Sequence, residues 1–176
     1  MILDNFIESF ELLKDGEFKD EVNPIDGVTY PQVCKDIPEQ AEQEILGKLR
    51  EILGREPQNP FMFMRRSPKG LPCPQQVHSD QSMGNYSLML YITEQGGTSL
   101  VSHKESGIAY NPAKQEYVDI IHRDQNIADA WEIIDMVKMK PNRAFIFKSK
   151  RLHRAEPVGG YGQGSEARCV LTCFFS

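Results

Sequence analysis

Two short stretches of the sequence place a histidine and an aspartate two positions apart. One pair is His78 and Asp80, just ahead of the apolar run over residues 86–92, and the other is His122 and Asp124. In an extended chain the side chains at positions i and i+2 point to the same side, so either pair can offer two ligands to one metal ion. A pair of this kind arises easily by chance, and a third ligand is therefore needed.

The remaining histidines, His103 and His153, are the candidates for the third ligand. Two histidines and one carboxylate on one face of an octahedral ion are typical of non-heme Fe(II) oxygenases. His153 follows Asp80 by 73 positions, which is enough for several strands to run away and return, whereas it follows Asp124 by only 29. We therefore favour a metal site made of His78, Asp80 and His153.

Two histidines are left outside this site. No strand is expected after His122, because residues 125–131 are polar and have a helical pattern, and we interpret it as a surface or lid residue. His103 follows an expected strand but lies only 23 positions after Asp80, and we interpret it as a surface or substrate-side residue.

The elements that must position the ligands change in character along the chain. Helical apolar spacing covers residues 4–14 and 38–54, and Gly54 is suited to end the second helix. Later residues form short apolar runs separated by turn residues. The expected strands cover residues 61–64, 86–92, 98–102, 133–139, 144–148, 151–157 and 168–175.

Helices followed by short strands predict a mainly β sandwich or jelly roll with N-terminal helices packed on one side. The length fits a single domain, residues 1–176. Within it we expect a helical support over residues 1–58 and a jelly-roll core over residues 59–176. Residues 104–130 are expected to form an insertion, with a short helix near residues 128–131.

Composition and charge narrow the class of partner. The net charge of −5 makes nucleic acid an improbable partner, and no apolar run is long enough to span a membrane. The first residues lack the basic start and continuous apolar stretch of a secretory signal. Four scattered cysteines do not form a disulfide framework, so we expect free thiols and a cytoplasmic protein. No oligomeric state is predicted.

Three stretches follow the first His-Asp pair in order: YSLMLYITEQGG over residues 86–97, VKMKPNRAFIFKSKRLHRAEPV over 137–158 and EARCVLTCFFS over 166–176. Together they resemble the core of the 2-oxoglutarate and Fe(II)-dependent dioxygenases, especially the compact prolyl-hydroxylase-like branch. The resemblance covers about residues 60–176 and implies a double-stranded β-helix, the jelly-roll core that cupins share.

The resemblance also implies a ligand set and a cosubstrate. Fe(II) would be held by His78, Asp80 and His153, leaving three positions for 2-oxoglutarate and O2. Arg168 would bind the far carboxylate of 2-oxoglutarate through the planar fork of its guanidinium. Tyr86 would donate a hydroxyl hydrogen bond to the same carboxylate.

One alternative and two departures accompany this assignment. Tyr91 lies on the opposite parity of the same strand and would replace Tyr86 if that strand faces the other way. Arg168 follows His153 by fifteen positions where the family has about ten, which implies a longer hairpin loop. Val170 stands where the family often has a small hydroxyl residue.

The implied activity is hydroxylation of a C–H bond in a peptide residue, an amino acid or another small substrate, with succinate and CO2 as coproducts. Two other functions compete with it. One is a non-catalytic cupin-like module that binds a metal or ligand, and the other is an interaction protein whose residues 104–130 bind a partner. A basic cluster beside His153 is either a rim for an anionic substrate or a solvated hairpin edge. Its members are Lys148, Lys150, Arg151 and Arg154.

Overall fold

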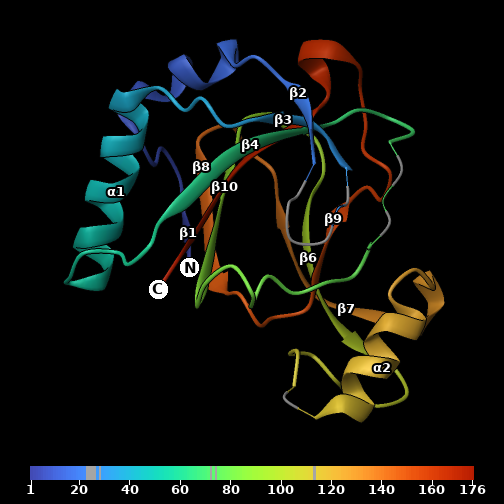
Figure 1. Ribbon diagram of the computed structural model, residues 1–176. Coiled ribbons are helices and arrows are strands. Elements are labelled where there is room, and N and C mark those ends of the chain that lie inside the picture. The colour runs from blue at the N-terminus through green and yellow to red at the C-terminus, as the bar shows by residue number, and fades with distance from the viewer. Residues whose placement is uncertain (23–26, 28, 72, 74, 113) are drawn as a thin grey trace.

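The chain folds into two antiparallel β-sheets (Figure 1). The computed structural model describes residues 1–22, 27, 29–71, 73, 75–112 and 114–176. The major sheet has the strand order β1-β8-β5-β10-β4-β3-β2, and the minor sheet has the order β7-β6-β9. The major sheet consists of β1 (Ile2–Leu3), β2 (Lys19–Val22), β3 (Thr29–Cys34), β4 (Phe61–Ser67), β5 (Tyr86–Tyr91), β8 (Arg143–Lys148) and β10 (Arg168–Phe175). The minor sheet consists of β6 (Gly97–His103), β7 (Trp131–Lys138) and β9 (His153–Glu156).

Strand β10 runs through the centre of the major sheet, between β4 and β5. All eight of its residues are buried, because both faces of the sheet are covered. Leu171 and Cys173 belong to the core cluster that includes residues of α1, whereas Val170 packs with Tyr91 in a second cluster. This second cluster also contains Val137 of β7, so it lies between the two sheets.

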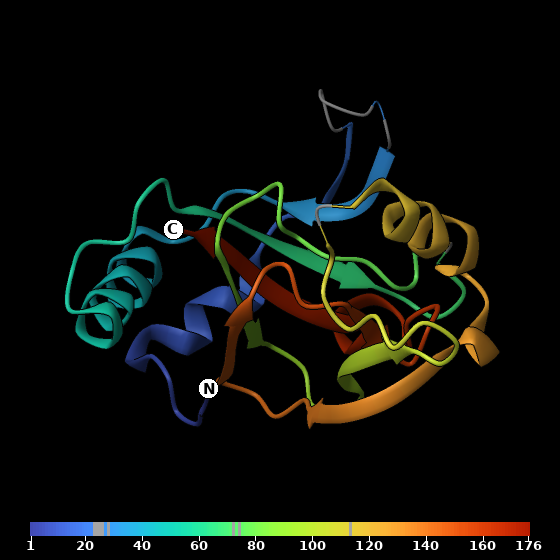
Figure 2. The same cartoon turned by 90° about the horizontal axis from the view of Figure 1, so that it is seen from below.

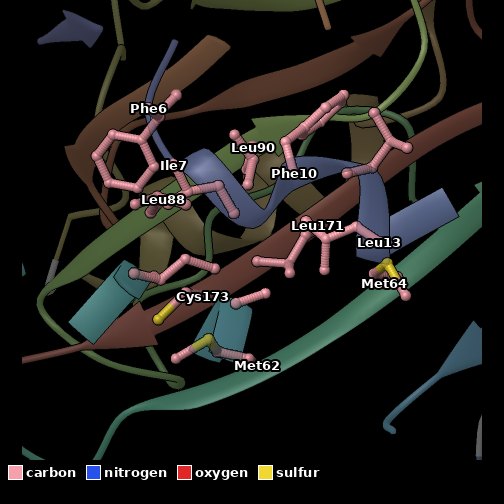
Figure 3. Packing of buried hydrophobic residues seen from close by; sticks show 14 of the residues in the cluster. Phe6, Ile7, Phe10, Leu13, Met62, Met64, Leu88, Leu90, Leu171 and Cys173 are labelled. Atoms are coloured by element: carbon pink, nitrogen blue, oxygen red, sulfur yellow. The ribbon is translucent and has the colours of Figure 1, made fainter. Parts of the chain in front are cut away.

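Helix α1 (Glu39–Leu53) covers the outer face of the major sheet (Figures 1 and 3). Its buried residues Ala41, Ile45 and Leu49 recur every fourth position and so form one face of the helix. The helix ends at Gly54, whose φ of 67° is the left-handed conformation that glycine adopts at low cost. The helix expected over residues 38–54 is thus present.

The first expected helix differs in type from the observed element. Residues Glu8–Asp15 form a 3-10 helix, η1, with non-helical backbone angles at Ser9, and not an α-helix over residues 4–14. Glu44 of α1 accepts hydrogen bonds from the N–H groups of Glu8 and Ser9, which ties the start of η1 to α1. The apolar spacing nevertheless buries Phe10 with other core side chains of this cluster (Figure 3).

The segment expected as a helical support, residues 1–58, contains strands as well as helices. This segment also supplies β1, β2 and β3, which pair at the two margins of the major sheet. The sequences of β2 (KDEV) and β3 (TYPQVC) have no continuous apolar run, because each strand is only partly buried. Their pairing with distant strands, and not their local pattern, makes them strands.

The insertion expected over residues 104–130 contains more regular structure than predicted. Helix α2 (Gln115–Asp124) was missed, and the 3-10 helix η2 (Ala128–Ala130) matches the short helix expected near residue 128. Five of the ten residues of helix α2 are exposed, and its buried residues are Ile121 and Asp124. It lies on the opposite side of the molecule from α1 (Figures 1 and 2).

The expected fold class is confirmed: a mainly β protein with N-terminal helices packed on one face and antiparallel sheets that form a jelly-roll core. Among the described residues, no helix is both long enough and apolar enough to cross a lipid bilayer.

Candidate metal centre

Three side chains that are distant in sequence converge between the two sheets. His78 and Asp80 lie on the segment between β4 and β5, and His153 begins β9. His78 and His153 form an isolated β-bridge, with backbone N–H···O distances of 3.1 and 3.0 Å. Nε2 of His78 lies 3.7 Å from Oδ1 of Asp80, and Nε2 of His153 lies 3.4 Å from Oδ2 of the same carboxylate. One ligand atom from each residue lies within 4.8 Å of the other two, as one metal ion requires.

Backbone carbonyls orient both imidazole rings. Nδ1 of His153 lies 2.9 Å from the carbonyl oxygen of Arg151, and Nδ1 of His78 lies 3.4 Å from that of Gln76. Because a carbonyl oxygen only accepts, Nδ1 carries the hydrogen in each ring and Nε2 keeps its lone pair. Nε2 of His153 is buried and has no hydrogen-bond partner among the described residues. A buried lone pair beside a carboxylate fits the donor set of a divalent metal.

The electrostatic setting keeps His78 neutral. The pKa of His78 is lowered to about 4, mainly by burial and also by the neighbouring His153, while Asp80 opposes both effects. A neutral imidazole at neutral pH is the form that binds a metal.

Asp80 is positioned by two serines that sequence analysis missed. The backbone N–H of Asp80 donates to the carbonyl oxygen of Ser149, and the hydroxyl of Ser87 donates to Oδ2 of Asp80 at 3.1 Å. Oγ of Ser87 also lies 2.9 Å from Oγ of Ser149. Ser87 is the polar residue in the otherwise apolar β5, and a buried hydroxyl of this kind needs a polar partner. A serine within an apolar strand sequence was therefore the signal by which Ser87 could have been predicted to contact a polar group.

Replacing Ser87 by alanine should weaken the binding of Mn(II) by roughly 10- to 100-fold, the usual loss when a residue that orients a ligand is removed. Mn(II) titration followed by electron paramagnetic resonance measures the affinity. The matched control is Ser99→Ala, since Ser99 of β6 is fully buried and its Oγ has no hydrogen-bond partner among the described residues. Equal affinities for wild type and Ser87→Ala would show that Ser87 does not orient Asp80.

Arg168 is a buried cation with unused hydrogen-bond donors. The residue is 7% exposed, and its Nη2 donates to the carbonyl oxygen of Gly97 at 3.2 Å. Its Nε is buried and has no partner among the described residues. Burial lowers the pKa of Arg168, and the nearby hydroxyl groups of Tyr91 and Tyr161 raise it. A desolvated guanidinium of this kind is suited to bind a carboxylate.

The structure places Tyr91, and not Tyr86, on the same face of the sheet as Val170, next to Arg168. Tyr91 pairs with Val170 of β10 and is fully buried between the sheets. Tyr86 faces the opposite side, where its ring stacks on Phe175 at 5.6 Å between centroids. The placement expected for Tyr86 is corrected for this reason, and Tyr91 is the tyrosine that can share a carboxylate with Arg168. Side chains along β5 point alternately to the two faces of the sheet, so Tyr86 and Tyr91, five positions apart, lie on opposite faces.

The basic cluster beside His153 is largely occupied by other contacts. Arg154 donates to Glu156 at 2.6 Å, and Arg151 donates to the carbonyl oxygen of Ala109 while its guanidinium lies 4.7 Å from the ring centroid of Tyr110. The ammonium of Lys150 also lies over that ring, and Lys148 is exposed. These contacts favour the interpretation of a hairpin edge.

Among the described residues, the second His-Asp pair does not belong to a group that could hold a metal ion. His122 is exposed, in agreement with its interpretation as a surface residue. Asp124 instead binds His103, with 3.0 Å between Oδ2 and Nε2, while Nδ1 of His103 lies 2.8 Å from the hydroxyl of Ser106. His103 is 2% exposed, so its interpretation as a surface residue was wrong. Its ring packs edge-on against Trp131 and connects β6 to α2.

Replacing Asp124 by alanine should destabilise the protein by about 1–3 kcal/mol at neutral pH, because buried His103 loses its acceptor. The hydrogen bond from Arg123, assisted by that from His103, lowers the pKa of Asp124 to about 2 from 3.8. A lowered folded-state pKa stabilises the protein above the unfolded value, and this stabilisation is lost as the pH falls toward 2. The variant and the wild type should therefore converge between about pH 4 and pH 2.

Urea unfolding at pH 7 and pH 3 measures this difference. Asp119→Asn is the control, since Asp119 is exposed on the same helix and accepts a hydrogen bond from the side chain of Gln115. A stability gap between Asp124→Ala and wild type that stays constant over this pH range would contradict the role given to Asp124.

Comparisons with known proteins support the fold. No family model matches the sequence, and the search of curated proteins finds no relative. Among solved structures, a prolyl-4-hydroxylase from Pseudomonas putida is similar with 14% identity and a TM-score of 0.50, over 99% of this chain and 90% of that chain. AviO1 from Streptomyces viridochromogenes Tue57 is similar with 11% identity and a TM-score of 0.50, over 92% of this chain and 73% of that chain. At the level of the fold, the resemblance to the prolyl-hydroxylase-like branch is confirmed.

Proposed function

We propose that this protein is an Fe(II)- and 2-oxoglutarate-dependent oxygenase that hydroxylates a C–H bond of a peptide residue, an amino acid or another small substrate. The observation that carries the proposal is the convergence of His78, Asp80 and His153. Nε2 of His153 is buried, has no hydrogen-bond partner among the described residues and lies 3.4 Å from Oδ2 of Asp80. In the fold of a prolyl-4-hydroxylase, this donor set is the one expected for Fe(II).

Each residue has a role that follows from its contacts. His78 and His153 would offer their Nε2 lone pairs to Fe(II), and Asp80 would offer one carboxylate oxygen while Ser87 holds the other. Arg168 would bind the far carboxylate of 2-oxoglutarate. When bound, Fe(II), 2-oxoglutarate and O2 supply an oxidative decarboxylation that yields succinate and CO2 and hydroxylates the substrate.

The environment of the site supports this role. Apolar side chains line the space between the sheets, and they exclude water from the bound cosubstrate. Phe147 packs edge-on against His153 at 4.9 Å between ring centroids, and Val170 and Tyr91 pack in the cluster beside it. Tyr91 would donate its hydroxyl hydrogen to the carboxylate that Arg168 binds, since burial raises the pKa of Tyr91 and keeps it protonated.

Anaerobic addition of Fe(II) and 2-oxoglutarate tests the proposal. A visible metal-to-ligand charge-transfer band should form, and O2 should then produce succinate from 2-oxoglutarate. Metal binding without a band and without succinate would instead support the cupin-like binding module. Indifference to chelators would favour an interaction protein.

We also propose a cytoplasmic location. All four cysteines are free, and three of them, Cys34, Cys169 and Cys173, are buried. Free thiols of this kind fit a reducing compartment.

A further inference from the structure

A second arginine points toward the same interior space as Arg168. Arg65 of β4 pairs with Val170 of β10 and with Val33 of β3. Paired residues of an antiparallel ladder share a face, so Arg65 lies on the face of Val170, toward the minor sheet. Its neighbours Met64 and Arg66 lie on the opposite face, where Met64 belongs to the core cluster of α1.

Arg65 is half-buried and has no anionic partner among the described residues. Its Nε is buried and makes no hydrogen bond to the described part of the chain. The guanidinium lies 5.5 Å from the ring centroid of Tyr30, an aromatic contact that does not use the Nε donor. Burial lowers the pKa of Arg65, and the groups that raise it, Cys73 and Tyr30, are not carboxylates.

Arg65 lies close to Arg168 on the same face of the major sheet. Arg168 pairs with Ser67, two positions after Arg65 on β4, so the two arginines extend from adjacent strands on one face. Arg168 reaches the carbonyl oxygen of Gly97 in the minor sheet, and Arg65 therefore also extends toward the minor sheet. A cation held there without an anion costs free energy, so a bound anion is expected.

The formal charges of the proposed complex sum to +1 when Arg65 is included, so one further anion would neutralise them. Fe(II), Asp80, Arg168 and dianionic 2-oxoglutarate together sum to zero, so Arg65 adds one uncompensated positive charge. Because 2-oxoglutarate already has Arg168 for its far carboxylate, the compensating anion is expected on the primary substrate. A planar carboxylate matches the fork of a guanidinium through two parallel hydrogen bonds.

We propose that Arg65 binds a carboxylate group of the primary substrate, which narrows the substrate class to carboxylates such as free amino acids or acidic side chains. This assignment rests on the proposed function. Arg65 is a binding residue for the substrate and is distinct from Arg168, which serves the cosubstrate.

Acetate and its neutral analogue acetamide are the probes. The protein is loaded with Mn(II), a paramagnetic and redox-inactive stand-in for Fe(II), and saturated with 2-oxoglutarate. Acetate should bind near the metal, so that its methyl protons relax faster, whereas acetamide should not. Replacing Arg65 by methionine should weaken acetate binding by about tenfold or more, as expected when a hydrogen bond to a charged group is lost.

Two variants serve as controls. Arg66→Met removes the neighbouring cation, whose guanidinium lies 3.9 Å from the ring centroid of Phe18 on the other face, and should bind acetate as the wild type does. Arg65→Lys keeps the charge and should retain part of the affinity, and thermal unfolding shows whether each variant is folded.

The outcomes separate this inference from the proposed function. A wild type that binds neither Mn(II) nor 2-oxoglutarate overturns the proposed function, and the role of Arg65 with it. Normal loading with equal acetate relaxation in wild type and Arg65→Met means that acetate binds the metal itself, and overturns only the role of Arg65. A loss of 2-oxoglutarate affinity in Arg65→Met as large as that in Arg168→Met would assign Arg65 to the cosubstrate and would also overturn the inference.

Discussion

Replacing His153 by alanine should abolish the charge-transfer band that the wild type is expected to form with Fe(II) and 2-oxoglutarate. His153 is 2% exposed, and its ring orientation is set by the carbonyl oxygen of Arg151. Without this imidazole, only His78 and Asp80 remain, and the vacated volume lies next to Phe147, which offers no donor atom. The loss of metal affinity should exceed the roughly 10- to 100-fold typical of residues that only orient a ligand.

Anaerobic absorption spectroscopy measures the band, and electron paramagnetic resonance of Mn(II) measures the metal affinity. His122→Ala is the matched control, because His122 is exposed on α2 and belongs to the other His-Asp pair. The control should keep the full band. A band of wild-type intensity in His153→Ala would remove His153 from the site and with it the proposed function.

The spacing of histidine and aspartate residues along the chain predicted the candidate metal ligands. It did not predict all of the strands around them. His78, Asp80 and His153 were selected because the separation between Asp80 and His153 allows several strands to intervene, and β5, β6, β7 and β8 do lie between them. The apolar runs of β5, β8 and β10 were recognisable because these strands are buried. Burial leaves a strong composition signal in a sequence.

The strands near one edge of the major sheet do not have this apolar composition. The expected strands omitted β2 and β3, since polar residues such as Lys19 and Gln32 alternate poorly with apolar ones and partners distant in sequence decide the pairing. Helix α2 was missed because it buries little of its surface. Its attachment through His103 and Asp124 is a tertiary contact, which the local pattern does not contain.

The local sequence pattern also could not predict which face of the sheet a given strand residue lies on. Tyr86 and Tyr91 have opposite parity on β5, and both are aromatic residues in an apolar run. The pairing of Val170 with Tyr91 decides which tyrosine lies between the sheets. The same pairing across β10 puts Arg65 inside and Arg66 outside. The registers of β10 with β5 and with β4 therefore put Tyr91 and Arg65 on the same face as Val170, and a shift of one residue in either ladder would move the residue of that strand to the opposite face.

Replacing Arg168 by methionine should raise the Kd of 2-oxoglutarate by roughly 30- to 4,000-fold, which corresponds to a loss of about 2–5 kcal/mol. Methionine fills much of the same volume, but it leaves the far carboxylate of the cosubstrate buried without a cation. The hydroxyl of Tyr91 alone cannot replace two charge-assisted hydrogen bonds. Metal binding should be unaffected, since Arg168 is not one of the three converging ligands.

Two titrations separate these effects: Mn(II) by electron paramagnetic resonance, and 2-oxoglutarate by the charge-transfer band with Fe(II). Arg66→Met is the matched control, because Arg66 pairs with Cys169, next to Arg168 in sequence, yet lies on the opposite face of the sheet. Arg168→Lys should show a smaller increase in Kd than Arg168→Met, because a lysine keeps the charge and loses the fork. If Arg168→Met bound 2-oxoglutarate as tightly as Arg66→Met, the buried guanidinium would be a structural cation, and the carboxylate pocket would have to lie elsewhere between the sheets.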